Sequence, residues 1–134
     1  MAPPSYSGGC LCGAVRYLAD GLARYLCYCH CASCRRAAGA PSVAWGTFQR
    51  ANFRVVRGQL REFASSAPVA RGSCADCGTA LTFRKLARPE EIDVTLASLD
   101  EPALLAPQMH VWVAEKLPWV VICDSLPQHQ QGGG

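Results

Sequence analysis

Nine cysteines in 134 residues, most of them two or three positions apart, constrain this chain more than any other feature of its sequence. Four of them lie in the stretch CYCHCASC, at positions 27, 29, 31 and 34, and two further pairs occur in CLC and CADC. Such near neighbours rarely form unstrained disulfides, whereas their thiolates can converge on one tetrahedral metal ion. Because their number is odd and no basic, apolar leader opens the sequence, the pattern predicts metal sites in a cytoplasmic protein.

The composition is that of one folded domain. Half of the residues are hydrophobic and only 17% are charged, which excludes a disordered chain, and 134 residues are enough to bury a core. No apolar run reaches the length that spans a bilayer, so no membrane partner is expected. Since no repeat or linker divides the sequence, we expect a single domain over residues 1–134, with frayed ends at MAPPS and QHQQGGG.

The charge of the chain argues against a nucleic-acid partner. The formal net charge of +3 counts every thiol as neutral, and seven thiolates with two Zn²⁺ would bring it to zero. The cationic residues are also scattered, with only Arg35–Arg36 and Arg84–Lys85 standing side by side. Two such pairs do not make the basic face that nucleic-acid binding requires. The oligomeric state does not follow from the sequence.

Most segments have the pattern of short strands. They are rich in Val, Phe, Tyr and Trp and bounded by Gly, Pro or Asn, at residues 13–18, 42–48, 53–57, 60–64, 79–84, 92–99, 109–114 and 119–123. In IDVTLASL, residues 92–99, apolar side chains alternate with Asp93 and Thr95, the period of a half-buried strand. One short helix is indicated over 32–39, ended by Gly39 and Pro41. The predicted fold class is therefore mainly β, with one short helix after CHCASC.

The pairs Cys10–Cys12 and Cys74–Cys77 predict a closed site of four thiolates. Each pair is followed by a glycine, which tolerates the backbone angles of a tight metal-binding turn. Cys12 and Cys74 are 62 residues apart, so one shared ion would join the N-terminal strand to the middle of the chain. Four thiolates leave no open position, and we expect a structural zinc; four small buried cysteines without metal are the alternative.

Cys29, Cys31 and Cys34 predict a second site, with three thiolates and one exchangeable position. That arrangement is typical of a catalytic zinc. The start of the short helix and the neighbouring Arg35 and Arg36 favour ionised thiols there. We expect two zinc ions per chain, of which the second is the more easily lost.

Cys27 leaves an alternative open at this second site. In an extended chain Cys27, Cys29 and Cys31 point to one face, which would allow a closed four-sulfur site. Three alternating sulfurs span roughly 13 Å of extended chain, however, and a bend that brings 29, 31 and 34 together leaves Cys27 behind. We favour a buried core cysteine at this position.

Other candidate residues have ordinary interpretations. His30 is expected to point away from the metal as a surface or hydrogen-bonding side chain. His110 is expected to be a half-buried strand histidine, a proton shuttle only if it faced a cleft. Cys123 is expected in the core, and Asp124 in a solvated pair with Lys116. No serine-protease-like triad, phosphate loop or carboxylate pair is discernible.

Four stretches resemble a known family. GGCLCGAVRY, CHCASCRRAAGAP with VAWGTF, GSCADCGTALTF and HVWVAEKLPW occur in this order between about residues 8 and 126. They resemble the glutathione-dependent formaldehyde-activating enzyme family, which includes centromere protein V. The resemblance implies a β-tent of stacked antiparallel sheets and no ligand role for Cys27. It assigns a structural zinc to Cys10, Cys12, Cys74 and Cys77, and a more exposed catalytic zinc to Cys29, Cys31 and Cys34.

The resemblance also implies an activity. The enzyme that names the family joins formaldehyde to the thiol of glutathione, giving S-(hydroxymethyl)glutathione, and in reverse it is a carbon–sulfur lyase. A thiol or thiol adduct is therefore the expected partner, with glutathione as the candidate and Arg35, Arg36 and Arg84 as candidate cations for its carboxylates. The alternative is a non-catalytic, zinc-stabilised binding module, as the centromere-protein relatives suggest; a zinc-ribbon-like nucleic-acid binder fits least. Three ligands with nearby arginines favour the enzyme.

Overall fold

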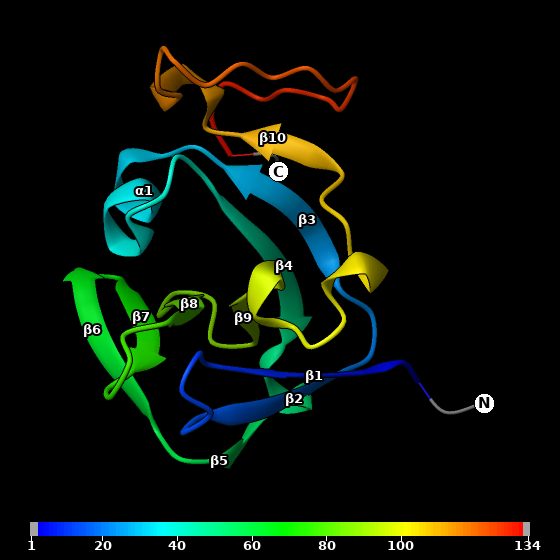
Figure 1. The fold of residues 1–134 in the computed structure, drawn as a ribbon, viewed down its shortest axis with the longest axis vertical. Coiled ribbons are helices and arrows are strands. Elements are labelled where there is room, and N and C mark those ends of the chain that lie inside the picture. Colours follow the sequence, from blue (N-terminus) through cyan, green and yellow to red (C-terminus); the bar gives the residue numbers. More distant parts are fainter. Residues whose placement is uncertain (1–2, 133–134) are drawn as a thin grey trace.

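Residues 3–132, which the computed structural model describes, form two β-sheets and one short α-helix (Figure 1). The small sheet is antiparallel and has the order β1-β2-β5, with bounds Ser5–Gly9, Arg16–Asp20 and Phe53–Arg57. The large sheet has the order β10-β3-β4-β9-β8-β7-β6, with bounds Met109–Val111, Arg24–Cys29, Val43–Gln49, Glu91–Thr95, Ala80–Lys85, Val69–Cys74 and Leu60–Ser66. Its strands pair antiparallel, except that β10 runs parallel to β3.

The helix α1 (Ala32–Ala38) begins almost directly after β3. Cys31 caps its N-terminus, and Gly39, at φ +63°, ends it with an N–H bond to the carbonyl of Arg35. Short 3₁₀ turns lie between strands or after them, at η1 (Arg50–Asn52), η2 (Leu96–Ser98), η3 (Pro102–Leu104) and η4 (Val113–Glu115). In the part of the chain that the structure describes, no helix is long and apolar enough to cross a membrane.

Alternation along the strands divides the large sheet into two faces. On one face Leu26, Phe48, Ile92 and Val94 form the main core with Tyr17 of the small sheet. The other face is concave, because the large sheet curls so that β7 and β6 lie across from β3 and β10 (Figure 1). The small sheet therefore packs against one face of the large sheet, and the other, concave face is not covered by a second sheet.

The predicted fold class, mainly β with one short helix, is confirmed. Residues 53–57 match β5 in full, and six other strands overlap predicted segments. β1 (SYSGG), β3 (RYLCYC) and β7 (VARGSC) were not predicted, because serine, glycine and cysteine mask their strand character.

The strand predicted at residues 119–123 is wrong. Trp119 is 69% exposed and Val121 78% exposed, and the segment joins no sheet. A strand at residues 119–123 would need a free sheet edge, but the outer edge of β10 is already paired with residues near the end of the chain. His110 N–H donates to the carbonyl of Pro127, and His129 N–H to the carbonyl of His110, both at 2.9 Å.

The expectation of frayed ends is wrong for most of both segments. Residues 127–131 return along β10 and η4 by backbone hydrogen bonds, and Gly21 N–H donates to the carbonyl of Pro4 at 2.8 Å. Residues 1–2 and 133–134, also expected to be frayed, lie outside the described residues.

Phe48 tests the stacking of the two sheets. Its side chain is 1% exposed, and its ring centroid lies 6.0 Å from that of Tyr6 on the small sheet. We expect Phe48→Ala to lower the free energy of unfolding by about 3–5 kcal/mol, because it removes buried apolar area and leaves a cavity. Urea unfolding measures this loss. Val56→Ala, at a side chain 53% exposed on β5, is the control and should change stability by less than about 0.5 kcal/mol; equal, small losses would contradict an inter-sheet core.

Candidate functional site

Four cysteine sulfurs from two distant turns form the first cluster. Cys10 and Cys12 lie just after β1, Cys74 ends β7 and Cys77 lies in the turn before β8. All four Sγ atoms lie within 4.8 Å of one another, and Cys12 Sγ is 3.7 Å from the Sγ of both Cys10 and Cys74. Zinc–sulfur bonds of about 2.3 Å in tetrahedral geometry separate the sulfurs by about 3.8 Å. The donor set of this four-sulfur cluster therefore fits a zinc ion.

Backbone N–H groups point at the sulfurs of the four-sulfur cluster. Val15 N–H donates to Cys10 Sγ at 3.2 Å, and the N–H groups of Asp76 and Cys77 donate to Cys74 Sγ at 3.4 Å. Hydrogen bonds of this kind favour the ionised thiolate over the thiol. The turns are thus arranged for charged sulfurs, as a metal site requires.

The two turns depend on glycine, as the sequence predicts. Gly13 and Gly78 both have φ +80°, a left-handed conformation that glycine adopts without strain. Thr79 follows the second glycine, and its hydroxyl accepts from Leu11 N–H at 3.1 Å, which joins the two turns. The same hydroxyl lies 3.2 Å from Cys77 Sγ, and this hydrogen bond lowers the pKa of Cys77 to about 5.

Cys29, Cys31 and Cys34 form a three-sulfur cluster where β3 meets α1. Their Sγ atoms lie within 4.8 Å of one another, and Cys34 N–H donates to Cys31 Sγ at 3.3 Å. Cys27 lies outside this group; it is a buried cysteine whose pKa is raised by burial to about 12. The structure therefore brings the three expected sulfurs together and buries Cys27, as expected; that the three bind a metal stays a prediction.

The three sulfurs are electrostatically coupled. Hydrogen bonds from Cys29 and then Cys34 lower the pKa of Cys31 to about 2, and the contact with Cys31 raises the pKa of Cys29. One negative charge is therefore easily held, whereas three thiolates at this distance repel one another. A divalent cation would offset that repulsion, so the residues fit a metal ion here as well.

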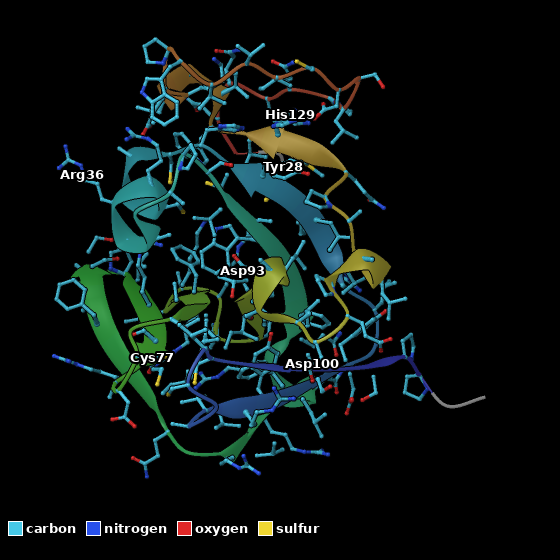
Figure 2. The ribbon with its side chains drawn as sticks, in the orientation of Figure 1. Tyr28, Arg36, Cys77, Asp93, Asp100 and His129 are labelled. Atoms are coloured by element: carbon cyan, nitrogen blue, oxygen red, sulfur yellow. The ribbon has the colours of Figure 1, made fainter. Side chains whose placement is uncertain are left out.

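Arg71 is the cation that lies against the three-sulfur cluster. It extends from β7, with both Nη atoms 3.7 Å from Cys34 Sγ and its guanidinium 4.8 Å from the ring centroid of Phe83. Arg35 and Arg36, the cations expected there, lie on α1 and do not line the cavity beside the cluster; Figure 2 shows Arg36 on the outer side of the helix. Sequence reasoning misses Arg71 because β7 was not predicted.

A cavity of about 380 Å³, the near cavity, opens on the three-sulfur cluster. All three cysteines of the cluster line it, and its apolar walls come from Trp45, Phe83, Val111 and Trp112. It continues into a second space of about 500 Å³, the far cavity, which shares Cys27, Thr47 and Lys85 with it. A ligand in this space can contact the sulfurs and, on the wall that both cavities share, Lys85 of strand β8.

Asp93 lines both cavities and is a second residue that sequence reasoning missed. The strand period correctly puts it on the face opposite Ile92 and Val94, but that face is the concave side of the sheet rather than open solvent (Figure 2). Its Oδ1 accepts from Thr47 Oγ1 at 2.6 Å. Burial raises the pKa of Asp93 to about 6.

The histidines form a chain of their own. His30 Nε2 lies 2.9 Å from His110 Nδ1, and His110 Nε2 lies 2.9 Å from Asp124 Oδ2. The expectation of a hydrogen-bonding His30 is confirmed, but its surface position is wrong, since both rings are buried. Asp124 bonds to His110 rather than to Lys116, and Cys123 is exposed rather than part of the core. Neither ring lines the near or the far cavity.

Asp124→Asn tests whether this chain holds the C-terminal segment against β10. We expect faster hydrogen exchange at the amides of His110 and His129, whose backbone bonds join the two segments, because the charged partner of the His110 ring is removed. Amide-resolved exchange measures this. Asp20→Asn, which removes the charge of an exposed carboxylate that accepts from Ser5, should leave both amides unchanged; equal exchange in Asp124→Asn and the wild type would contradict a fastening role.

Comparisons with known proteins agree with this geometry. A model of the glutathione-dependent formaldehyde-activating enzyme family matches residues 5–115, which include both cysteine clusters. An uncharacterized lyase of Schizosaccharomyces pombe is 34% identical over 80 residues, which are 60% of this chain. The chain spans 58% of the length of that relative.

A solved structure shares the fold. The crystal structure of a Rhodobacter sphaeroides protein superposes with a TM-score of 0.61, at 23% identity over 91% of this chain and 98% of the other. At that identity the likeness concerns the fold alone, and it supports the mainly β architecture described above.

Proposed function

This chain belongs to the glutathione-dependent formaldehyde-activating enzyme family, and from that premise we propose that it is a zinc-dependent, carbon–sulfur lyase-like enzyme acting on a thiol adduct. Its reaction resembles that of S-(hydroxymethyl)glutathione synthase, with glutathione as the candidate thiol. We propose residues 1–134 as one such domain, working in the cytoplasm. The observation that carries the proposal is the three-sulfur cluster, whose sulfurs lie within 4.8 Å of one another and line an open cavity.

The two clusters have different roles in this proposal. The four-sulfur cluster would hold a structural zinc, because four thiolates complete a tetrahedral shell. The three-sulfur cluster would hold the second zinc. When bound there, zinc supplies a Lewis acid with one exchangeable position, able to hold a thiolate or polarise a carbonyl oxygen.

Arg71 and the apolar walls would serve the reaction itself. The thiol sulfur bonds to the aldehyde carbon, the carbonyl π electrons move to oxygen, and the proton lost from sulfur ends on that oxygen. Arg71, at the edge of the near cavity, offsets negative charge on the sulfurs and on the developing oxyanion. Trp45, Phe83 and Val111 would give the small aldehyde an apolar wall to pack against beside the sulfurs.

A non-catalytic, zinc-stabilised binding module is the second candidate function. Trp119 and Val121 are strongly exposed and would be its contact residues. This module would need the four-sulfur cluster for stability, but it would not need a cavity beside the three-sulfur cluster.

The test is the rate of S-(hydroxymethyl)glutathione formation above the spontaneous background. The zinc-loaded protein should accelerate it, and Arg71→Gln should lower kcat/KM by about tenfold or more because a charge-assisted contact to the sulfur is lost. Arg36→Gln, on the outer side of α1, is the matched control and should react like the wild type. No acceleration by the wild type would contradict the glutathione activity and favour the binding module.

A further inference from the structure

The wall shared by the near and far cavities carries a half-buried carboxylate, Asp93, and an exposed ammonium, Lys85. Asp93 uses Oδ1 to accept from Thr47, and among residues 3–132 no donor reaches its Oδ2. Within the same range Lys85 Nζ has no hydrogen-bond or ion-pair partner, although Lys85 lines both cavities. Arg84 differs, because Glu62 already binds its guanidinium at 2.6 and 2.7 Å. Asp93 and Lys85 are thus the charges available to a ligand.

The strand register relates Asp93 to Arg71, the residue that contacts the three-sulfur cluster. Asp93 lies directly opposite Phe83, and Phe83 directly opposite Arg71, which contacts Cys34. Neighbouring strands are about 4.8 Å apart, so the Cα atoms of Asp93 and Arg71 are about 10 Å apart. Asp93 is therefore two strands away from the residue that contacts Cys34, on the wall of the same cavity. A thiol ligand whose sulfur lies at the cluster would place a second group beside Asp93.

Titratable side chains lie around Asp93 on the strands that pack beside it. They are Glu91 on β9, Arg84 and Lys85 on β8, Cys27 and Tyr25 on β3, and Arg71 on β7, with Arg88 in the turn between β8 and β9; the facing residue of β4, Thr47, does not titrate. Burial raises the pKa of Asp93, its bond with Thr47 lowers it, Glu91 raises it and Lys85 lowers it. A half-buried carboxyl of this kind destabilises the fold in its charged form, which is typical of a residue kept for a ligand.

We propose, on the basis of the thiol-adduct function above, that Asp93 and Lys85 form a subsite for the amino-acid head group of the thiol substrate. Asp93 binds its ammonium and Lys85 its carboxylate, while the sulfur lies at the three-sulfur cluster. A head group with an ammonium and a carboxylate on the same carbon satisfies both residues at once. A thiol without the ammonium leaves the Asp93 carboxylate desolvated and unpaired, so the subsite selects against it.

Equilibrium binding tests the subsite without relying on catalysis. The probes are S-methylglutathione, its N-acetyl derivative, which lacks the ammonium, and the γ-aminobutyryl analogue, which lacks the neighbouring carboxylate. Calorimetric titration of the zinc-loaded wild type should give a Kd lower by about ten- to hundredfold for S-methylglutathione than for either analogue. Asp93→Asn should no longer distinguish S-methylglutathione from its N-acetyl derivative, but should still prefer it over the analogue without the carboxylate. Lys85→Gln should show the opposite pattern.

Controls separate this inference from the proposed function. Asp20→Asn, on β2 and bonded to Ser5, should behave like the wild type. Equal binding of all three probes by the wild type overturns the subsite, whether or not the protein accelerates adduct formation. Selective, Asp93-dependent binding without any acceleration supports the subsite and contradicts the enzymatic proposal.

The stability of Asp93→Asn gives a second readout. The raised pKa means that the folded protein holds a proton on Asp93 more tightly than the unfolded chain does, so ionisation of Asp93 destabilises the fold. The folded protein loses this stability in full above about pH 6, and it loses none of it below the ordinary carboxyl pKa. Asp93→Asn should therefore unfold at a higher temperature than the wild type at pH 7.5, and the difference should shrink toward pH 4. An unchanged or lowered midpoint at pH 7.5 would overturn the assignment of an uncompensated carboxylate.

Discussion

The convergence of four cysteine sulfurs from two turns, 62 residues apart between Cys12 and Cys74, is the constraint on which the rest of the structure depends. One turn follows β1 of the small sheet and the other joins β7 to β8 of the large sheet. Their meeting holds the small sheet against one face of the large sheet, where the main core forms. The concave face of the large sheet therefore receives no second sheet, and it is free to line a cavity.

That free face explains why residues with incomplete partners gather there. Arg71 extends toward Cys34 rather than toward a carboxylate, and Asp93 is half-buried with a hydroxyl as its hydrogen-bonding partner. Neither arrangement is what stability alone would select, because a buried charge is costly without a counter-charge. Both residues line the space beside the three-sulfur cluster, together with the aromatic side chains of Trp45 and Phe83. In our two proposals the sulfur of the substrate lies at the cluster, and its head group lies at Asp93 and Lys85.

The cysteine clusters and the helix end could be predicted from the sequence, but the side chains that line the cavity could not. The two cysteine clusters follow from short spacings, and the end of α1 follows from Gly39, so both were expected correctly. Arg71 and Asp93 acquire their role only because the large sheet curls, which no local pattern specifies. Residues 119–123 have the composition of a strand, but the edge of β10 is occupied by the returning chain end. Two distant segments compete for the same sheet edge, and the strand propensity of a single segment cannot show which of them pairs there.

The open three-sulfur site is the central claim, and counting zinc per chain by native mass spectrometry tests it most directly. The wild type, Cys27→Ser and Cys34→Ser would be prepared under reductant and compared. The account predicts two zinc ions in the wild type and in Cys27→Ser, and one in Cys34→Ser, because Cys34 belongs to the three-sulfur cluster and Cys27 lies outside it. One zinc in Cys27→Ser would mean a closed four-sulfur site, and would contradict an open position for substrate.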